Sequence, residues 1–528
     1  MNRQHMIAQL TATPVWDVLV IGGGATGLGI AVDAAKRGYK TLLLEQSDFA
    51  KGTSSRSTKL IHGGVRYLAQ GHIKLVLEAL KERDLLLQNA AHLVKKQVFI
   101  VPVYTWWDAF LYFCGLKLYD LLAGKRGLGA SAFISKTKTL QALPNINQTN
   151  LKGGIRYLDC QFDDSRLAIN LAQTAAEAGA CELNYVQVTG LLKNEAAKVY
   201  GVTAQDLETG IKYNLHAKAV INATGVYADA ILKMEEPEAK PLIQPSQGVH
   251  LVLDHTFLPG HAALMIPKTS DGRVLFAVPW QGKLLLGTTD TLREKAELEP
   301  TALDQEIDFI LSTAAGYLVK KPNRHDVLAV FAGLRPLAAH QGNPKATKDI
   351  SRNFKIILSE SQLVTVTGGK WTIYRKMAET TLDKLIQAKL LPYSPCTTAT
   401  SPIHGHTTTF LESRHLKVYG TDATAIAQLQ QQTPELATRL HPDYTYTKAE
   451  VVWAARHEMA RTVEDVLARR LRLLFLDAAA AMDAAPAVAA ILAVELEQSN
   501  SWADEQVRSF TKLARTYTLQ PAQQAQQI

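Results

Sequence analysis

A strand, a glycine-rich turn, a helix and a second strand follow one another over residues 18–45, and this order constrains the fold more than any other feature. The segment opens with V-L-V-I-G-G-G-A-T-G-L-G and closes with T-L-L-L-E. Gly22 allows the tight turn, Gly24 lets the backbone approach a pyrophosphate, and Gly27 lets the helix pack closely on the strand. The N–H groups at the helix N-terminus are available to phosphates. Glu45 stands 18 residues beyond Gly27, near the expected position of the acid that binds a ribose hydroxyl, so the segment predicts a dinucleotide-binding βαβ unit.

A polar loop, T-S-S-R-S-T-K-L-I-H-G-G-V-R-Y-L, follows the βαβ unit at residues 53–68. An enzyme that binds NAD would normally continue here with another βαβ unit. The loop instead carries several hydroxyl groups, a lysine, an arginine and the titratable imidazole of His62. One interpretation is a surface loop of small polar residues. A histidine flanked by Gly63 and Gly64 directly after a nucleotide-binding unit favours a functional loop.

The composition is that of an ordinary globular chain. Of the 528 residues, 47% are hydrophobic and 20% are charged, which is enough for roughly two to four domains with large cores. The 57 basic residues outnumber the 49 acidic ones, and the resulting net charge of +8 suits an anionic small substrate or an anionic membrane surface. The sequence contains no dense Lys/Arg run and no nucleic-acid-binding module, so nucleic-acid binding is not expected.

Cysteine usage and hydropathy indicate the compartment. The four cysteines lie far apart without a C-x-x-C spacing, so we expect neither a disulfide framework nor a metal site, and a reducing cytoplasm fits. The first residues, M-N-R-Q-H-M-I-A-Q-L-T-A-T-P, lack the apolar core of a signal peptide. No run of 18 uncharged apolar residues occurs, so we do not expect a membrane-spanning helix.

Further motifs carry a resemblance to a known family. They are I-G-G-G-A-T-G-L-G (21–29), the loop 53–68, D-D-S-R-L (163–167), N-A-T-G (222–225), G-T-T-D (287–290), A-G-L-R-P-L (332–337), I-S-R-N (350–353), T-G-G-K-W-T-I-Y-R-K-M-A-E (367–379) and H-E-M-A-R-T-V-E-D-V-L-A-R-R (457–470). With them the chain resembles, over residues 15–475, the FAD-dependent glycerol-3-phosphate dehydrogenases, within the flavin oxidoreductases that include D-amino-acid oxidase. The resemblance implies FAD as cofactor, oxidation of sn-glycerol 3-phosphate to dihydroxyacetone phosphate, and transfer of the electrons to a membrane quinone.

Other functions stay open. A soluble glycerol-3-phosphate oxidase that passes the electrons to oxygen and produces hydrogen peroxide resembles the chain almost as well at its active site. A flavin oxidase that acts on amines is disfavoured by the arginines available for a phosphate group. A non-catalytic scaffold stabilised by FAD would tolerate replacement of the candidate reactive residues without loss of turnover.

The expected fold class is α/β, with a Rossmann-like FAD-binding domain, a substrate domain built on an antiparallel sheet, and a C-terminal all-helical domain. Hydrophobic spacing predicts helices near 71–90 and 163–179, and Gln281-Gly282 predicts a hairpin turn between two strands. Three short strands at 186–192, 199–207 and 211–215 precede the strand that ends in N-A-T-G. The predicted boundaries are an N-terminal tail (1–14), the FAD-binding domain (15–95, 150–243 and 340–390), an inserted membrane-contact or helical segment (96–149), the substrate domain (244–339), a linker (391–409), the helical domain (410–517) and a disordered tail (518–528).

Alcohol oxidation of this kind needs a base for the hydroxyl proton. His62 is the first candidate because imidazole titrates near neutral pH; it is otherwise a structural histidine that bonds the FAD. His250, on a predicted strand, is the rival base or a core histidine. By resemblance the catalytic residues are His62, Arg335 and Lys370, with the last two nearest the reacting oxygen, and the substrate-binding residues are Arg66, Tyr67, His250 and Arg352.

The motif T-G-G-K-W-T follows an apolar strand, 363–366, and predicts a helix that begins near Thr372. Its N–H groups would face the side of the flavin where negative charge develops on reduction, and Lys370 would add a full charge there. The expected FAD-binding residues are Gly22, Gly24, Gly27, Glu45, Thr53, Ser54, Ser55, Lys59, Leu60, His62, Gly225, Asp290, Gly368, Gly369, Lys370 and Thr372.

Residues 104–126, Y-T-W-W-D-A-F-L-Y-F-C-G-L-K-L-Y-D-L-L-A-G-K-R, combine a dense aromatic and leucine face with charged residues. This pattern is typical of a helix that lies in a membrane interface, and a helix buried in the core is the alternative. Together with the implied quinone, it predicts peripheral attachment to the inner, cytoplasmic face of the cytoplasmic membrane. A homodimer is left open.

Overall fold

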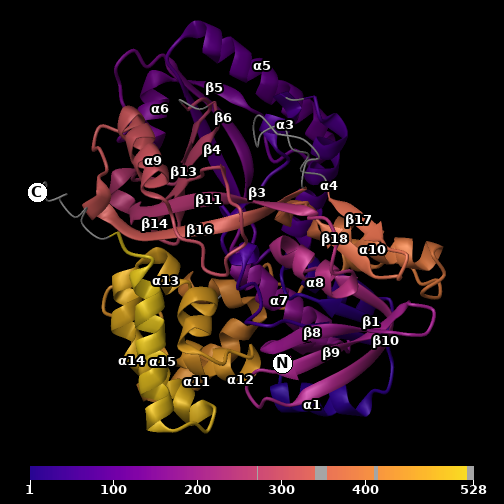
Figure 1. Cartoon of the computed structure of the whole chain (residues 1–528). Helices are drawn as coiled ribbons and strands as arrows, with labels where there is room; N and C mark the ends of the chain where they lie inside the picture. The colour runs from indigo at the N-terminus through magenta and orange to yellow at the C-terminus, as the bar shows by residue number, and fades with distance from the viewer. Residues whose placement is uncertain (70, 270–271, 339–353, 410–413, 520–528) are drawn as a thin grey trace, which may run out of the picture.

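The computed structural model describes residues 1–69, 71–269, 272–338, 354–409 and 414–519. Figure 1 shows the two sheets in different halves of the molecule, with the C-terminal helices packed beside them. Arg352 lies outside the described residues, as does the side chain of Arg66 and most of the tail predicted at 518–528.

The first sheet is the nucleotide-binding sheet that the glycine turn predicts. Its order is β17-β18-β10-β1-β2-β7, and neighbouring strands from β18 to β7 run parallel. Parallel strands need crossover connections, and on this sheet helix α2 packs against both α7 and α10. The elements are β1 (Trp16–Ile21), α2 (Ala25–Lys36), β2 (Thr41–Leu44), α7 (Asp164–Glu177), β7 (Cys181–Leu183), β10 (Lys212–Asn222), β17 (Lys355–Leu358), β18 (Val364–Thr367) and α10 (Tyr374–Gln387).

The excursion before the N-A-T-G motif is confirmed as β8 (Val186–Lys193), β9 (Val199–Asp206) and β10. The strand expected at 211–215 and the strand that ends in N-A-T-G are one continuous strand, however. Residues 212–216 of β10 pair antiparallel with β9, and residues 217–222 pair parallel with β1. Because β10 belongs to both sets of strands, it connects the excursion rigidly to the nucleotide-binding sheet.

The second sheet is largely antiparallel and contains, among the described residues, the order β15-β11-β14-β13-β12-β4-β6-β3, with β16 paired to β11 and β5 paired to β6. The predicted hairpin is confirmed: Gln281 and Gly282 both have positive φ (46° and 78°), as the tight turn requires. The strands are β3 (Leu60–Ile61), β4 (Lys95–Val103), β5 (Ala132–Ser135), β6 (Gly153–Gln161), β11 (Ile243–Asp254), β12 (Ala263–Ile266), β13 (Leu275–Trp280), β14 (Lys283–Gly287), β15 (Thr291–Leu292) and β16 (Val327–Ala338).

Strand pairing corrects two predicted boundaries. Residues 95–103 and 153–161 form β4 and β6, which pair over their whole length and belong to the second sheet. They were expected at the edges of an inserted segment (96–149) and within the FAD-binding domain (150–243). Because these strands meet across a long separation in sequence, composition along the chain does not reveal their pairing. The expected N-terminal tail (1–14) also contains a helix, α1 (Arg3–Ala12), which packs against β7.

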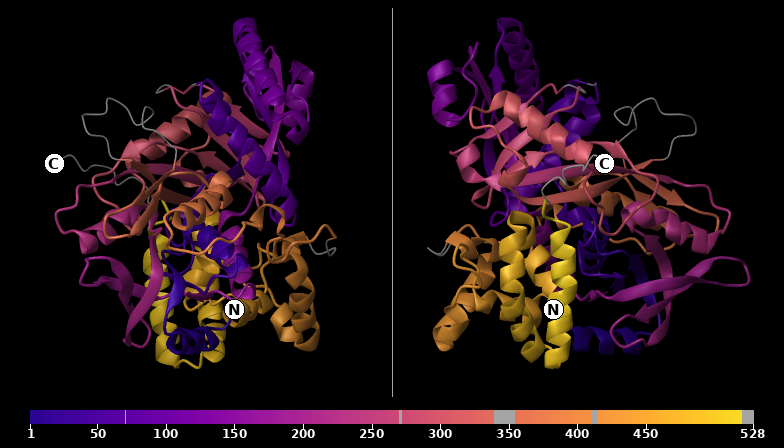
Figure 2. Two further views of the ribbon diagram at one scale, coloured as in Figure 1. Left: turned by 90° about the vertical axis from the view of Figure 1, so that its right-hand side faces the viewer. Right: turned by 60° about the vertical axis from the view of Figure 1, so that its left-hand side comes forward.

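The remaining helices before the C-terminal part surround the second sheet and its junction with the first. The helix expected near 71–90 is confirmed as α4. These helices are α3 (Val65–Ala69), α4 (Ile73–Asn89), α5 (Trp106–Ala123), α6 (Lys136–Ala142), α8 (Ala228–Glu235) and α9 (Asp304–Tyr317). Figure 2 shows α5 at the edge of the molecule that lies farthest from the C-terminal helices.

The segment predicted as a linker, 391–409, is held to the first sheet's helices by His404. Its imidazole bonds Glu177 of α7 through Nδ1 at 2.5 Å and Asp422 through Nε2 at 2.8 Å. Burial alone would lower the pKa of His404, but the two carboxylates outweigh it and raise the pKa to about 9. The ring therefore carries a charge that both acids stabilise.

The C-terminal helices are α11 (Ala423–Gln432), α12 (Lys448–His457), a π-helix (Asp465–Arg470), α13 (Leu473–Leu476), α14 (Ala478–Glu495) and α15 (Asn500–Arg515). Their core is shared with the second sheet, since Phe331 and Trp280 belong to the same buried cluster as Leu474. Within the described residues, α14 is the one helix long and apolar enough to cross a membrane, but half of it is buried against neighbouring elements, as in a core helix.

Candidate active site

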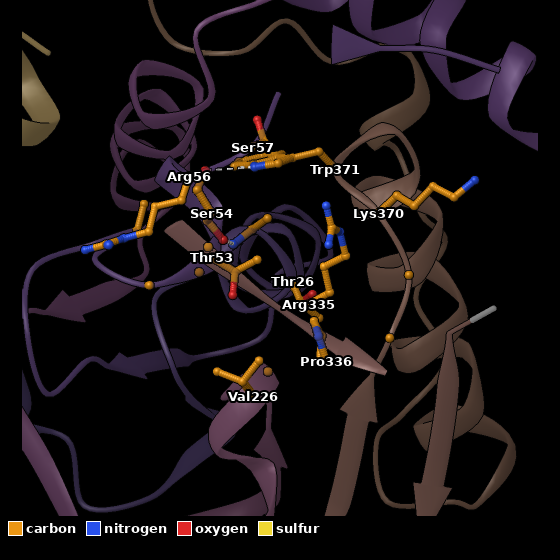
Figure 3. A pocket seen from close by; sticks show the side chains of 18 of the residues that line it. Thr26, Thr53, Ser54, Arg56, Ser57, Val226, Arg335, Pro336, Lys370 and Trp371 are labelled. Atoms are coloured by element: carbon orange, nitrogen blue, oxygen red, sulfur yellow. Dashed lines mark hydrogen bonds between the residues drawn. The ribbon is translucent and has the colours of Figure 1, made fainter. Parts of the chain in front are cut away.

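A cavity of about 560 Å³ lies between the two sheets. Its wall combines the glycine turn after β1, the loop after β2, residues 53–60, the inner face of the second sheet, and the turn after β18. Figure 3 shows this arrangement, with Thr53 and Ser54 on one side and Arg335 and Lys370 on the other. Residues from many separate parts of the sequence therefore meet at one site.

The glycine turn forms the end of the cavity nearest β1. Gly22 has a φ of +107°, and a Cβ there would lie 2.9 Å from the carbonyl oxygen of Ala223. Gly27 does not line the cavity; a Cβ on it would lie 1.9 Å from the Gly22 oxygen, so it acts through the close packing of α2. Gly24 precedes the first residue of α2 and lines the cavity. The turn thus offers backbone, with no side chain in the way, at a helix N-terminus.

Glu45 lies at the end of β2, on the cavity wall. One carboxylate oxygen accepts a hydrogen bond from the Gly23 N–H at 2.7 Å, and the other accepts one from the Ser47 N–H at 2.9 Å. Burial raises the pKa of this carboxyl, and the two N–H groups oppose that rise. A carboxylate fixed in this way keeps further lone pairs for a ribose hydroxyl, as the sequence predicts.

The loop 53–60 has two faces. Thr53, Ser54 and Leu60 line the cavity; Ser54 Oγ accepts from the N–H of Ala25 at 2.9 Å, and its carbonyl accepts from Trp371 Nε1 at 2.9 Å. Ser55 and Lys59, which were also expected to bind the cofactor, are buried on the opposite face and do not line the cavity. The physical reason is a partner behind the loop, since the Lys59 ammonium bonds a buried carboxylate at 2.7 Å.

Arg335 reaches the cavity from β16. Its Nη2 donates to Thr288 Oγ1 at 3.0 Å, and its Nη1 lies 3.4 Å from Asp290 Oδ1. Asp290, expected to contact the cofactor, does not line the cavity but holds this guanidinium from behind. Gly248, which the sequence did not indicate, lines the cavity beside Arg335, and a Cβ on it would lie 2.3 Å from Arg335 Nη2. Arg335 is thus a fixed cation in a partly enclosed site.

Both candidate histidines line the cavity, in different surroundings. His250 is buried, stacks on Phe331 with ring centroids 5.0 Å apart, and has its Nε2 2.9 Å from Thr58 Oγ1. Burial, followed by the nearby charges of Lys59 and Arg335, lowers the pKa of His250 well below its usual value. His250 is therefore a neutral group that exchanges hydrogen bonds.

The turn after β18 brings Gly368, Gly369, Lys370 and Thr372 to the cavity. The two glycines have φ of 78° and 80°. A 3₁₀ turn (Trp371–Ile373) runs directly into α10, which begins at Tyr374, so the helix expected to begin near Thr372 is confirmed. The Lys370 ammonium lies 3.5 Å from the centroid of the Tyr67 ring. In Figure 3 its side chain points away from that of Arg335, so the two cations are on one wall but not side by side.

Several parts of the cavity were not predicted. An apolar end is formed by strands of the second sheet, where Tyr157 OH donates to Met265 Sδ at 3.2 Å and the Tyr157 ring stacks on Phe99. Asp159 lines the cavity close by and accepts from Arg83 Nη1 and Tyr119 OH, both at 2.9 Å. Residues 98–103 are apolar, but they were expected in the inserted segment (96–149), because their partner strand cannot be identified from local sequence. Gly225, on the N-A-T-G turn, lines the cavity as expected.

Comparison with known proteins identifies what this arrangement is similar to. Residues 17–375 match the family described as FAD dependent oxidoreductase, and residues 360–506 match the C-terminal domain of alpha-glycerophosphate oxidase. The probable mitochondrial glycerol-3-phosphate dehydrogenase of Caenorhabditis elegans is 41% identical over 98% of this chain and 75% of its own length. The mitochondrial glycerol-3-phosphate dehydrogenase of Bos taurus is 40% identical, over 97% of this chain and 75% of its own length.

Solved structures agree with the sequence matches. The glycerol-3-phosphate dehydrogenase from Bacillus halodurans, complexed with FAD, is 30% identical and has a TM-score of 0.80 over 99% of this chain and 98% of that one. The L-alpha-glycerophosphate oxidase from Mycoplasma pneumoniae, with FAD bound, is 18% identical with a TM-score of 0.56 over 76% of this chain, a likeness of fold alone. The expected fold class, with its nucleotide-binding sheet, second sheet and C-terminal helices, is confirmed.

Proposed function

Because the chain belongs to the FAD-dependent oxidoreductases and, within them, to the glycerol-3-phosphate dehydrogenases, we propose that it oxidises sn-glycerol 3-phosphate to dihydroxyacetone phosphate and passes the electrons to a membrane quinone. FAD is the cofactor of this family. The observation that carries the proposal is that one cavity joins the glycine turn and Glu45 to the fixed guanidinium of Arg335. A dinucleotide and an anionic substrate would then share one enclosed site.

The residues present fit FAD. Gly22 and Gly24 leave backbone at the phosphate end, the Glu45 carboxylate is held by two N–H groups, and Gly368 and Gly369 leave backbone at the other end. When bound, FAD supplies a two-electron acceptor for the secondary alcohol at C2 of the substrate.

The chain's own residues would act on charge and protons. Arg335 would bind the phosphate or the C2 oxygen as negative charge develops there, and since Thr288 and Asp290 already hold it, little reorganisation is needed. His62 would take the hydroxyl proton, because burial leaves His250 too weakly basic for that task. His250 would instead orient the substrate through a hydrogen bond.

The exposed side chains of α5 support contact with a membrane surface. Trp107, Phe110 and Leu121 of this helix are 71%, 61% and 75% exposed, although soluble surfaces rarely collect such side chains. Lys125 and Arg126 follow at its end, where anionic headgroups would attract them. We therefore propose that α5 lies on the inner face of the cytoplasmic membrane.

The apolar end of the cavity supports a quinone as the electron acceptor. Tyr112 and Phe113 on the inner side of α5 pack against the cluster that contains Phe99, Tyr157 and Met265. An apolar acceptor that left the bilayer beneath α5 would thus meet apolar surface that leads toward the cavity.

Oxygen is the alternative acceptor, because residues 360–506 match a domain that is described for an oxidase. The acceptors can be separated with substrate-reduced enzyme that is mixed with aerated buffer or, anaerobically, with a soluble quinone. The proposal predicts fast reoxidation by the quinone and slow reoxidation by oxygen. Fast reoxidation by oxygen with hydrogen peroxide as product would replace the dehydrogenase by an oxidase.

A further inference from the structure

Three arginines of the C-terminal part, Arg469, Arg470 and Arg472, lie close together in sequence at the end of the π-helix. We call them the arginine run. All three are at least 98% buried, although nothing in the proposed reaction uses them. Burying a guanidinium is costly unless it is fully paired, so their partners define what they do.

Arg472 holds the back of the loop 53–60. Its Nη2 donates to the carbonyl oxygen of Ser55 at 2.7 Å and to Asp164 Oδ1 at 3.1 Å. The Lys59 ammonium donates to the same Ser55 oxygen at 2.7 Å and to Asp164 Oδ2 at 2.7 Å. One carbonyl and one carboxylate therefore tie the loop, helix α7 and the C-terminal part together.

This junction is dry. Lys59 and Asp164 are fully buried, and the Lys59 ammonium lies 5.2 Å from the Phe331 ring centroid and 5.5 Å from that of Phe475. Burial lowers the pKa of Lys59 to about 7, whereas an arginine stays protonated in proteins. Arg472 is thus the cation on which the junction depends when Lys59 loses its proton.

The other two arginines hold the loop that follows β2, residues 45–52. Arg469 and Arg470 both bind the carboxylate of Asp48 in this loop, and Arg470 Nη2 donates to Asp48 Oδ1 at 2.9 Å. Burial alone would raise the pKa of Asp48, but the two arginines outweigh it and lower the pKa. The N–H of Ala50, two residues on, donates to the Gly23 carbonyl of the glycine turn at 2.9 Å.

The opposite faces of both loops form the cofactor end of the cavity. Glu45 and Ala50 line it from the first loop, and Thr53, Ser54 and Thr58 line it from the second. The arginine run therefore touches no part of the cavity and yet is bonded to both loops that enclose it.

We propose that the C-terminal helical domain acts as a clamp that retains FAD, with Arg472 and its neighbours as positioning residues for the two cofactor loops. The clamp slows FAD release because the loops cannot separate from α2 while the arginine run holds them. It rests on FAD as the cofactor and not on the proposed substrate or electron acceptor.

The test compares holoenzyme of Arg472→Met with wild type. FAD release is followed without substrate, as the rise in flavin fluorescence when dilute holoenzyme is incubated with an excess of an FAD-binding apoprotein. The clamp predicts release at least about tenfold faster, which corresponds to about 1.4 kcal/mol of binding free energy if association is unchanged. Arg508→Met is the matched control, since this exposed arginine of α15 pairs with Glu505 on the surface, and it should release FAD as wild type does.

Two further measurements separate retention from general stability. Arg472→Lys keeps the positive charge on a shorter side chain but has a single nitrogen, so it loses the second donor, Nη1, which bonds the Ala468 carbonyl at 2.9 Å. It should release FAD at an intermediate rate even if the methionine variant fails to fold. The gain in melting temperature on adding FAD should shrink in both variants. Wild-type release rates and an unchanged FAD-induced gain, in variants that only melt at lower temperature, would overturn the proposal.

Discussion

Removing the hydroxyl of Tyr119 tests whether α5 positions the loop that carries His62. The Tyr119 oxygen accepts from the Gly63 N–H at 2.9 Å and donates to Asp159 at 2.9 Å. A Cβ on Gly63 would lie 2.5 Å from that oxygen, so the approach depends on glycine. Tyr119→Phe keeps the ring and leaves one buried N–H without its acceptor, while Asp159 keeps its bond from Arg83 at 2.9 Å.

A buried donor without a partner costs about 1–3 kcal/mol. If the loop shifts to relieve that cost, His62 leaves its reacting position, and we expect the activation free energy to rise by an amount in the lower part of that range. A rise of about 1.4 kcal/mol slows a reaction tenfold. We expect anaerobic stopped-flow reduction of the flavin at saturating substrate to slow about tenfold, with FAD content unchanged. Tyr112→Phe, on the same helix but packed against the apolar cluster, is the control. Reduction of the Tyr119 variant at the wild-type rate would refute the positioning role.

Four other predictions follow from the site and its surroundings. His62→Ala should lower turnover at least about 100-fold with FAD still bound, and turnover retained in a steady-state assay would remove His62 as the base. Arg335→Met should raise KM and also slow flavin reduction at saturation; a stopped-flow rate that equals wild type would contradict the second effect. The double variant Trp107→Ser and Phe110→Ser should no longer sediment with phosphatidylglycerol vesicles, while its turnover with a soluble quinone stays unchanged; sedimentation as for wild type would exclude α5 as the contact. Because the pKa of His404 is raised to about 9, its charge stabilises the fold fully below about pH 6.5, and this stabilisation is lost as the pH rises through about 9. The melting temperature of wild type should therefore decrease over that pH range, and His404→Gln should make the decrease smaller.

The features predicted best from the sequence are the turns and helices that depend on the spacing of neighbouring residues. The turn at Gly22, the Gln281-Gly282 hairpin and helix α4 depend on residues close together in the chain, and each is present in the structure. The residues of β6 were placed in the FAD-binding domain (150–243), although the strand belongs to the second sheet, because its partner, β4, is far away in sequence. The same limit concealed the apolar end of the cavity.

The site residues also divide into those that a local motif indicates and those that only distant packing determines. The motif 53–60 indicated a cofactor loop, but a loop has two faces, and Lys59 turned out to serve the one behind the cavity. Asp290 likewise sits behind Arg335. Gly248 and Tyr119 gave no local signal, because their roles arise only from side chains that other strands bring against them.

Anaerobic mixing of the purified, FAD-loaded protein with sn-glycerol 3-phosphate tests the central claim most directly. Parallel samples receive glycerol, which lacks the phosphate, and sn-glycerol 1-phosphate, which places the C2 hydroxyl with the opposite hand. The account predicts rapid bleaching of the flavin absorbance by sn-glycerol 3-phosphate and slow or no bleaching by the other two. An unchanged flavin spectrum with sn-glycerol 3-phosphate, in protein that dithionite bleaches fully, would contradict the assigned substrate.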